Sequence, residues 1–153
     1  MNVVYTLGYD AREPAKFLEI LRKYGIRAVV DVRRFPKSKI SYYSKESLES
    51  SLRENAIEYF WLGDELGGFR GGYIDHMKTE AFWRGIKKLL AIINNCSPIV
   101  ILCKEYIPWR CHRRYIATVL KSLGFKVLHI IDLNKVIEHP YTLDKYGIRP
   151  FIF

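Results

Sequence analysis

Alternation of β-rich runs with helical patterns is the feature that most constrains the fold of this chain. Five short runs of β-branched and other apolar residues are separated by segments in which apolar residues recur at helical spacing. Parallel strands need long crossover connections, and these are usually helices. The alternation therefore predicts a three-layer α/β/α sandwich with a mostly parallel, about five-stranded sheet.

The expected elements can be placed along the chain. Strands are expected at 3–8, 27–32, 57–62, 98–103 and 126–131, and helices at 13–25, 44–55, 79–95 and 114–124. The glycine-rich stretch 63–73 fits neither element and is expected to be a mobile loop with the hinges of a lid. At 153 residues, with no repeat or linker, the chain is expected to form a single α/β domain, 1–153, with the tail 132–153 packing across it.

Composition and charge narrow the class of partner. A hydrophobic content of 49% excludes a disordered chain. No apolar run reaches the roughly 20 residues that cross a bilayer, and the first residues lack the pattern of a signal peptide. We therefore expect a cytoplasmic protein without a membrane partner. The net charge of +9 favours phosphate-containing ligands and nucleic acid, although a solvated basic surface gives the same total.

The cysteines and glycines match no familiar cofactor motif. Cys96, Cys103 and Cys111 cannot all pair within one chain, and a cytoplasmic location argues against a disulfide framework. Their spacing contains no CxxC, so no metal site is expected. The glycine-rich stretch matches neither a phosphate-binding loop nor a dinucleotide fingerprint, which leaves any cofactor unknown.

Ionisable residues follow four of the expected strands at their carboxyl ends. In a parallel sheet these ends share one rim, where open α/β sheets bind ligands. The residues that follow the strands in turn are Tyr9 and Asp10; Asp31, Arg33 and Arg34; Asp64, Glu65 and Arg70; and Cys103, Glu105, Arg110, His112 and Arg113. The opposite ends show nothing comparable, so the sequence predicts a binding site at this rim.

The same stretches carry a resemblance to a known family. The strongest pieces are "DVRRFP" (31–36), "ELGG" (65–68) and Cys103 followed by "CHR" (111–113). The fuller set is "YTLGYD", "FLEILRKYGIRAVVDVRRFPKS", "SKESLESSLRENAIEYFWLGDELGG", "MKTEAFWRGIKKLL" and "ILCKEYIPWRCHRRYIATVLKSLGFKVLHI". Over roughly residues 3–131 the chain resembles the uncharacterised bacterial and archaeal family called domain of unknown function 488. The resemblance implies an α/β fold with a strand-end cluster and assigns no activity. Members often carry a histidine at the position of Tyr9, so a mechanism that uses that histidine is in doubt here.

Arginines are the residues we expect to hold an anion. Arg110, Arg113 and Arg114 lie near the start of the helix expected over 114–124, where guanidinium forks and free N–H groups together can hold phosphate. With Arg33, which follows the second strand on the same rim, Arg110 and Arg113 are the residues we expect to bind the anion. His112, Tyr9 and Arg70 are further ligand-binding candidates on the same rim.

Two carboxylates on this rim are the acid–base candidates. Asp31 and Glu105 follow the second and the fourth strand, within reach of a ligand at the rim. The alternative for Asp31 is an ion pair with Arg33 that orders the loop.

Cys103 supports a different functional hypothesis, in which a cysteine is the nucleophile. A strand-end thiol near a helix start and several arginines is similar to rhodanese and to cysteine phosphatases, which makes Cys103 a candidate nucleophile. Those loops place a basic residue after five intervening residues, and here that position is Trp109, with Arg110 one residue later. The alternative is a buried structural thiol.

Aromatic and basic residues are interleaved in the rim loops, as they are where proteins stack bases while holding a nucleic-acid backbone. The aromatic set is Phe35, Tyr42, Tyr43, Phe69, Tyr73 and Trp109, and the basic set is Arg33, Arg34, Lys37, Lys39 and Arg70. The leading hypothesis is therefore a protein that binds a nucleotide or nucleic acid at the rim and hydrolyses it. The alternatives are a non-catalytic nucleic-acid binding module and a cysteine-based sulfurtransferase or phosphatase.

Overall fold

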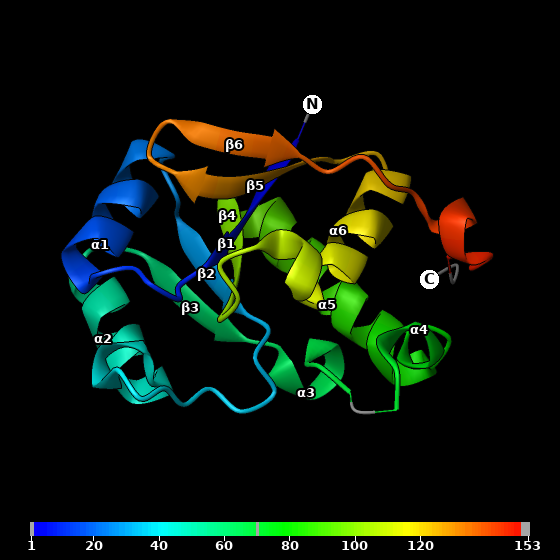
Figure 1. Ribbon diagram of the computed structural model, residues 1–153, viewed down its shortest axis with the longest axis horizontal. Helices are drawn as coiled ribbons and strands as arrows, with labels where there is room; N and C mark the ends of the chain where they lie inside the picture. The colour runs from blue at the N-terminus through cyan, green and yellow to red at the C-terminus, as the bar shows by residue number, and fades with distance from the viewer. Residues whose placement is uncertain (1, 70, 151–153) are drawn as a thin grey trace.

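A computed structural model describes residues 2–69 and 71–150 and contains one central sheet with helices on both faces (Figure 1). The strands are β1 (Val3–Gly8), β2 (Ala28–Asp31), β3 (Glu58–Trp61), β4 (Ile99–Cys103), β5 (Lys126–Asp132) and β6 (Lys135–Glu138). The α-helices are α1 (Pro14–Lys23), α2 (Lys45–Glu54), α3 (Gly63–Leu66), α4 (Tyr73–His76), α5 (Glu80–Cys96) and α6 (Arg113–Ser122). Short 3-10 turns are η1 (Ser41–Tyr43), η2 (Pro108–Arg110) and η3 (Leu143–Tyr146). The α/β sandwich expected from the alternation is confirmed.

The sheet has the strand order β3-β2-β4-β1-β5-β6. The pairings among β1 to β5 are parallel, and β6 pairs antiparallel with β5. The sixth strand was not expected from the sequence. It forms because Leu133 and Asn134 close a hairpin that returns the chain along β5.

Two apolar clusters fill the layers on either side of the sheet. β4 shows the division, because Val100 and Leu102 pack with the residues of α1 and α2, whereas Ile101 and Cys103 pack with those of α5 and α6. Successive strand residues point to opposite faces, so a strand buried on both faces reads as a continuous apolar run. In Figure 1, α1 and α2 accordingly lie on one side of the sheet, and α5 and α6 on the other.

The connections that follow β1 and β4 leave the sheet on opposite faces. These strands are neighbours, yet β1 continues into α1 on one face and β4 continues into α6 on the other. Neighbouring strands whose connections leave on opposite faces open a crevice at their carboxyl ends, and this is where such sheets bind ligands. The fold therefore places a topological switch point next to Gly8 and Cys103.

The stretch 63–73 is more ordered than the sequence led us to expect. It contains α3 and the start of α4 rather than one long loop, and Arg70 lies outside the described residues. Gly63 is needed where α3 meets the strand-end segment, because a Cβ atom there would lie 1.9 Å from the carbonyl oxygen of Arg33. Close packing of backbone, as well as flexibility, accounts for glycine in this stretch.

The tail after β6 runs along the α6 side of the molecule. Leu143 and Ile148 are buried in the same apolar cluster as α6, and the backbone N–H of Leu143 donates to Ser122 Oγ at 2.7 Å. Residues 151–153 lie outside the described part of the chain. Within residues 2–69 and 71–150, none of the helices combines the length and apolar character needed to span a lipid bilayer.

Candidate functional site

A cleft of about 780 Å³ opens at the carboxyl ends of β1, β2 and β4. Its lining comes from segments far apart in the sequence: Tyr9, Arg33, Arg34, Phe35, Lys37, Gly68, Cys103, Lys104, Glu105, Arg110, Cys111 and His112. This is the rim that the sequence predicted and the switch point that the strand order creates. The cleft is the candidate functional site.

Backbone contacts fix the floor of the cleft. The N–H of Tyr9 donates to the carbonyl of Cys103 at 3.0 Å, and that of Asp10 donates to Lys104 at 2.9 Å. The pairing of β1 with β4 therefore continues past the ends of the two strands. Gly8 permits this approach, because a Cβ atom on it would lie 1.7 Å from the carbonyl oxygen of Glu105.

Exposed cations dominate the walls. Arg34, Lys37, Lys104 and Arg110 are exposed, and among the described cleft-lining residues Glu105 is the one exposed carboxylate. Positive charges that converge on a concave surface concentrate the field there and attract anions.

An exposed aromatic ring lies among these charges. Phe35 is 77% exposed, whereas phenylalanine is among the residue types most often buried. The guanidinium of Arg34 lies 4.6 Å from the ring centre of Phe69 and 5.9 Å from that of Phe35. The wall therefore offers a free ring face as well as charge.

Asp31 and Arg33 form a buried ion pair beside the cleft. Arg33 donates from Nε to Asp31 Oδ1 at 2.9 Å and from Nη2 to Oδ2 at 2.7 Å, and the Tyr59 hydroxyl donates to Oδ2 at 2.6 Å. Burial, then the charge of Asp31, raises the pKa of Tyr59, so its hydroxyl remains a donor. Asp31 is fully buried with both oxygens in use, which corresponds to the loop-ordering alternative considered from the sequence.

One donor of Arg33 has no partner. Its Nη1 atom is buried without a hydrogen bond, and the side chain is only 6% exposed. The guanidinium carbon lies 5.1 Å from the ring centre of Tyr9, which is itself buried at the floor of the cleft. A buried unsatisfied donor of this kind is costly unless a ligand or water meets it.

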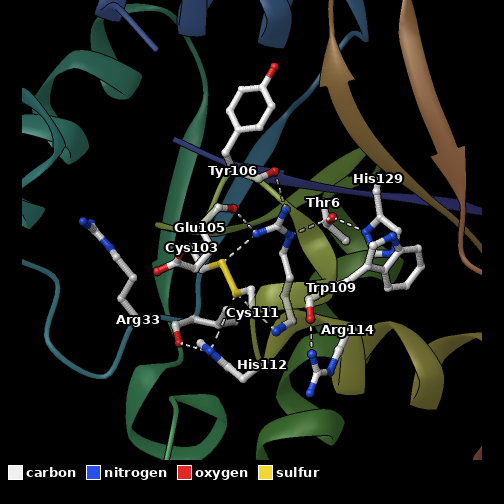
Figure 2. The surroundings of a disulfide bond; sticks show 12 residues. Thr6, Arg33, Cys103, Glu105, Tyr106, Trp109, Cys111, His112, Arg114 and His129 are labelled. Carbon is white, nitrogen blue, oxygen red and sulfur yellow. Dashed lines mark hydrogen bonds between the residues drawn. A yellow bond between two sulfur atoms is a disulfide. The ribbon is translucent and has the colours of Figure 1, made fainter. Parts of the chain in front are cut away.

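Arg113 is buried completely and binds neighbouring parts of the protein. Its Nη1 donates to Cys103 Sγ at 2.9 Å and to the Glu105 carbonyl at 2.6 Å, and its Nε donates to Thr6 Oγ1 at 3.1 Å. Figure 2 labels these three acceptor residues, Cys103, Glu105 and Thr6. Burial, followed by the positive charge of Arg12, lowers the pKa of Arg113 to about 9. Arg113 does not line the cleft, so the structure separates it from the exposed cations with which the sequence grouped it.

Cys103 and Cys111 are joined by a disulfide at the cleft, against our expectation from the sequence. The expectation failed because it rested on the odd number of cysteines and on cellular location, and neither reports how close two thiols lie in the fold. The end of β4 and the turn η2 bring the two thiols together over only eight residues (Figure 2). Cys96, at the end of α5, is free.

His112 is oriented by a backbone carbonyl. Its Nε2 lies 2.9 Å from the carbonyl oxygen of Val32, which can only accept, so Nε2 carries the hydrogen. Nδ1 therefore has a free lone pair, 3.8 Å from Cys111 Sγ. Burial lowers the pKa of His112, which favours the neutral ring at neutral pH.

The comparison with known families decides the classification. The family described as domain of unknown function DUF488 matches residues 13–120. The chain belongs to this family. No curated protein and no solved structure matched the chain.

The blocks that carried the family resemblance meet at the cleft of this DUF488 chain. Arg33, Arg34 and Phe35 come from "DVRRFP", Gly68 comes from "ELGG", and Cys111 and His112 come from "CHR". Pieces separated by about 80 residues in the sequence therefore contribute to one site.

The remaining predicted residues are distributed as follows. Arg110 and Glu105 are exposed in the cleft, Tyr9 and Cys103 lie at its floor, and Arg70 falls outside the described residues. Lys104 was missed as a candidate, although its position directly after β4 was a usable signal. Lys37 and Phe35 were recognised only as part of the mixed basic and aromatic set, and Arg34 was recognised there and among the residues that follow the second strand. Among residues 2–69 and 71–150 no three metal-ligating side chains are grouped.

A second set of polar groups is buried behind the cleft. Thr6 Oγ1 lies 2.6 Å from His129 Nδ1, His129 Nε2 lies 2.9 Å from His139 Nδ1, and His139 Nε2 lies 2.8 Å from Thr118 Oγ1. Trp109, expected among the rim aromatics, packs against both histidine rings instead. Burial lowers the pKa of His129 to about 3 and that of His139 to about 4, so both rings are neutral.

Proposed function

We propose that the strand-end cleft binds a phosphate-containing ligand, either a nucleotide or a segment of single-stranded nucleic acid. The observation that carries the proposal is the convergence of four exposed cations, Arg34, Lys37, Lys104 and Arg110, around one cleft with a single exposed carboxylate. Phosphate groups are recognised by such clusters of Arg and Lys side chains.

Two further features support this ligand class. The unpartnered Nη1 of Arg33 is a buried donor at the cleft wall, and an anion's oxygen is a suitable acceptor for it after a small side-chain adjustment. Phe35 presents its exposed ring among the cations. Base–aromatic stacking next to backbone charge neutralisation is how proteins hold single strands.

The proposal extends to hydrolysis of the bound ligand, with Glu105 as the general base. Glu105 is exposed at the cleft, where it can reach a water molecule beside a bound phosphate. Asp31 is a weaker candidate for this role, because Arg33 and Tyr59 occupy its oxygens. Hydrolysis predicts that Glu105→Gln abolishes turnover and leaves binding in place.

Paired charge-removal variants test the binding proposal. Lys37→Gln with Arg110→Gln removes two cleft charges, and Arg84→Gln with Lys87→Gln removes the same charges from the exposed surface of α5. A fluorescently labelled single-stranded oligonucleotide is titrated with each protein. We expect the cleft variant to bind at least about tenfold more weakly and the α5 variant to change affinity by less than about twofold.

The control separates a site from a diffuse basic surface. Equal losses in the two double variants would mean that total charge, and not the cleft, determines binding, which contradicts the proposal. Competition by inorganic phosphate or a nucleoside triphosphate distinguishes the ligand classes, since a nucleotide site is displaced by the triphosphate at lower concentrations than by phosphate.

A further inference from the structure

The paired cysteines lie where a ligand can reach them. Cys103 ends β4 and Cys111 follows η2, their sulfur atoms are bonded to each other, and both residues line the cleft. Each residue is nearly buried, with 2% of Cys103 and 5% of Cys111 exposed. A reactant can therefore approach the sulfur atoms only through the cleft.

Arg113 carries a buried charge without a close ion pair among the described residues. Its hydrogen bonds go to the Thr6 hydroxyl, to the carbonyls of Glu105 and Tyr106, and to Cys103 Sγ (Figure 2). Of these acceptors only the sulfur can ionise near neutral pH. A buried cation without an ion pair is unfavourable, and the more distant charge of Glu105 offsets only part of the burial that lowers the pKa of Arg113. Arg113 is therefore expected to favour the thiolate form of Cys103 when the disulfide is reduced.

His112 supplies a proton acceptor for the second thiol. Its Nε2–H is committed to the Val32 carbonyl, and its Nδ1 lone pair lies 3.8 Å from Cys111 Sγ. The backbone N–H of Arg113 also approaches this sulfur, at 3.5 Å. The two cysteines therefore have different surroundings: Cys103 faces a cation, and Cys111 faces a neutral base.

We propose that Cys103 and Cys111 form a redox-active dithiol–disulfide couple that exchanges with small, negatively charged disulfides in the cleft. Small size follows from the narrow access to the sulfur atoms, and negative charge follows from the exposed cations that surround the entrance. The couple itself does not depend on phosphate binding. Its preference for anions rests on the same cations as the proposed function.

The exchange proceeds in two steps. The Cys103 thiolate attacks one sulfur of the substrate disulfide, forms a mixed disulfide and releases the first thiolate. His112 Nδ1 then takes the proton of Cys111, whose thiolate attacks Cys103 Sγ, closes the Cys103–Cys111 bond and releases the second thiolate. The protein loses two electrons and the substrate disulfide gains them. A dithiol reductant regenerates the protein by the reverse exchange.

Oxidation also changes the environment of Arg113. When the Cys103–Cys111 bond forms, the thiolate disappears and the buried guanidinium loses the counter-charge nearest to it. A disulfide whose reduced form is stabilised in this way is readily reduced. The couple is therefore expected to be readily reversible rather than a permanent cross-link, and a large excess of the substrate disulfide drives its oxidation.

The test uses the full chain with Cys96→Ser, so that the third thiol cannot react. The reduced protein is mixed at near-neutral pH with oxidised glutathione, which is anionic, or with cystamine, which is cationic, and the products are followed by mass spectrometry. We expect loss of two protein thiols without a retained adduct, and a rate at least about tenfold higher with the anionic disulfide. With Cys111→Ser added, one mixed disulfide on Cys103 is expected to persist.

Two further measurements test the reactivity of Cys103 and the role of the cleft cations separately. At about pH 6.5, where an ordinary thiol is about 1% ionised, Cys103 should react with iodoacetamide at least about tenfold faster than N-acetylcysteine. Adding Lys37→Gln and Arg110→Gln should abolish the preference for glutathione over cystamine. A Cys103 no more reactive than N-acetylcysteine would overturn the redox couple. Equal rates with the two disulfides in the unaltered cleft would overturn the assignment of anionic substrates, whatever the oligonucleotide titration shows.

Discussion

Gly8 ends β1 at the place where the chain passes directly under the loop that follows β4. A Cβ atom at this position would lie 1.7 Å from the carbonyl oxygen of Glu105 and 2.4 Å from its carbonyl carbon. Both are backbone atoms, which cannot move aside as the end of a flexible side chain can. The loop that carries Cys103, Lys104 and Glu105 therefore depends on the absence of a side chain at residue 8.

Gly8→Ala tests this close approach. The added methyl group must push the 104–106 loop away from β1, and we expect the free energy of unfolding to fall by about 3 kcal/mol. Urea denaturation measures the change. Gly71→Ala is the matched control, because a Cβ atom on Gly71 meets nothing within 4 Å. That control should change stability by less than about 0.5 kcal/mol, and equal effects of the two substitutions would contradict the packing argument.

Burial of Arg113 shows what the sequence alone could predict at single residues. The dense basic stretch 110–114 suggested a surface that holds an anion, and Arg110 is indeed exposed in the cleft. Arg113, however, lies three and seven residues before Ile116 and Leu120, on the inward face of α6, and all three are fully buried. The helical period carried this information. The charge of the stretch suggested exposure instead, because arginine is rarely fully buried.

At the scale of elements, a histidine pair links the two sides of the β5–β6 hairpin to α6. His129 lies in β5, His139 follows β6, and Thr118 in α6 closes the chain of hydrogen bonds. Both rings are fully buried and neutral, with pKa values of about 3 for His129 and about 4 for His139. The cationic groups that act on the pair are Arg113, Lys121 and Lys145.

Because of this histidine pair, the free energy of unfolding should change with pH in the mildly acidic range. The unfolded chain binds protons on these histidines below about pH 6.5, whereas the folded chain resists protonation down to about 3 for His129 and about 4 for His139. Their contribution is therefore fully present above pH 6.5 and is lost as the pH falls. The free energy of unfolding should decrease from about pH 6.5 to 5 by up to about 1.4 kcal/mol per pH unit for each histidine.

Chemical denaturation of the wild type and of His139→Gln measures this slope. The variant should be less stable at alkaline pH, because its hydrogen bonds are altered, and should lose less stability on acidification. Parallel curves for the two proteins in this window would contradict the assignment.

Sequence patterns predicted the regular elements well and the irregular ones poorly. β4 was identifiable from its run of apolar residues, "IVILC". A strand that is covered on both faces is apolar at every position, so its sequence pattern is continuous. β6 was missed because its four residues, "KVIE", show no alternation of apolar and polar residues and are too few to distinguish from a loop. The stretch 63–73 was assigned to a mobile loop because glycine serves both flexibility and close packing, and the sequence does not say which.

At the scale of the whole molecule, topology and charge point to the same place. β1 and β4 separate at a switch point, and the loops that follow them meet the loop after β2 around the cleft. A chain with a net charge of +9 has cations on many surfaces, but here four of them, Arg34, Lys37, Lys104 and Arg110, face one hollow. A general rule about open α/β sheets predicted the rim from the sequence. Which basic side chains remain exposed there depends on tertiary packing and required the structure.

The central claim is that this cleft, and no other basic surface, holds phosphate. The most direct measurement is a titration of the isotope-labelled protein with sodium pyrophosphate, followed by the backbone amide signals in NMR spectra. We expect saturable shifts concentrated in residues 33–37, 104–105 and 110–112. Shifts spread evenly over the surface, or concentrated around the aromatic and basic hollow formed by Arg114, Tyr141 and Lys145, would contradict it.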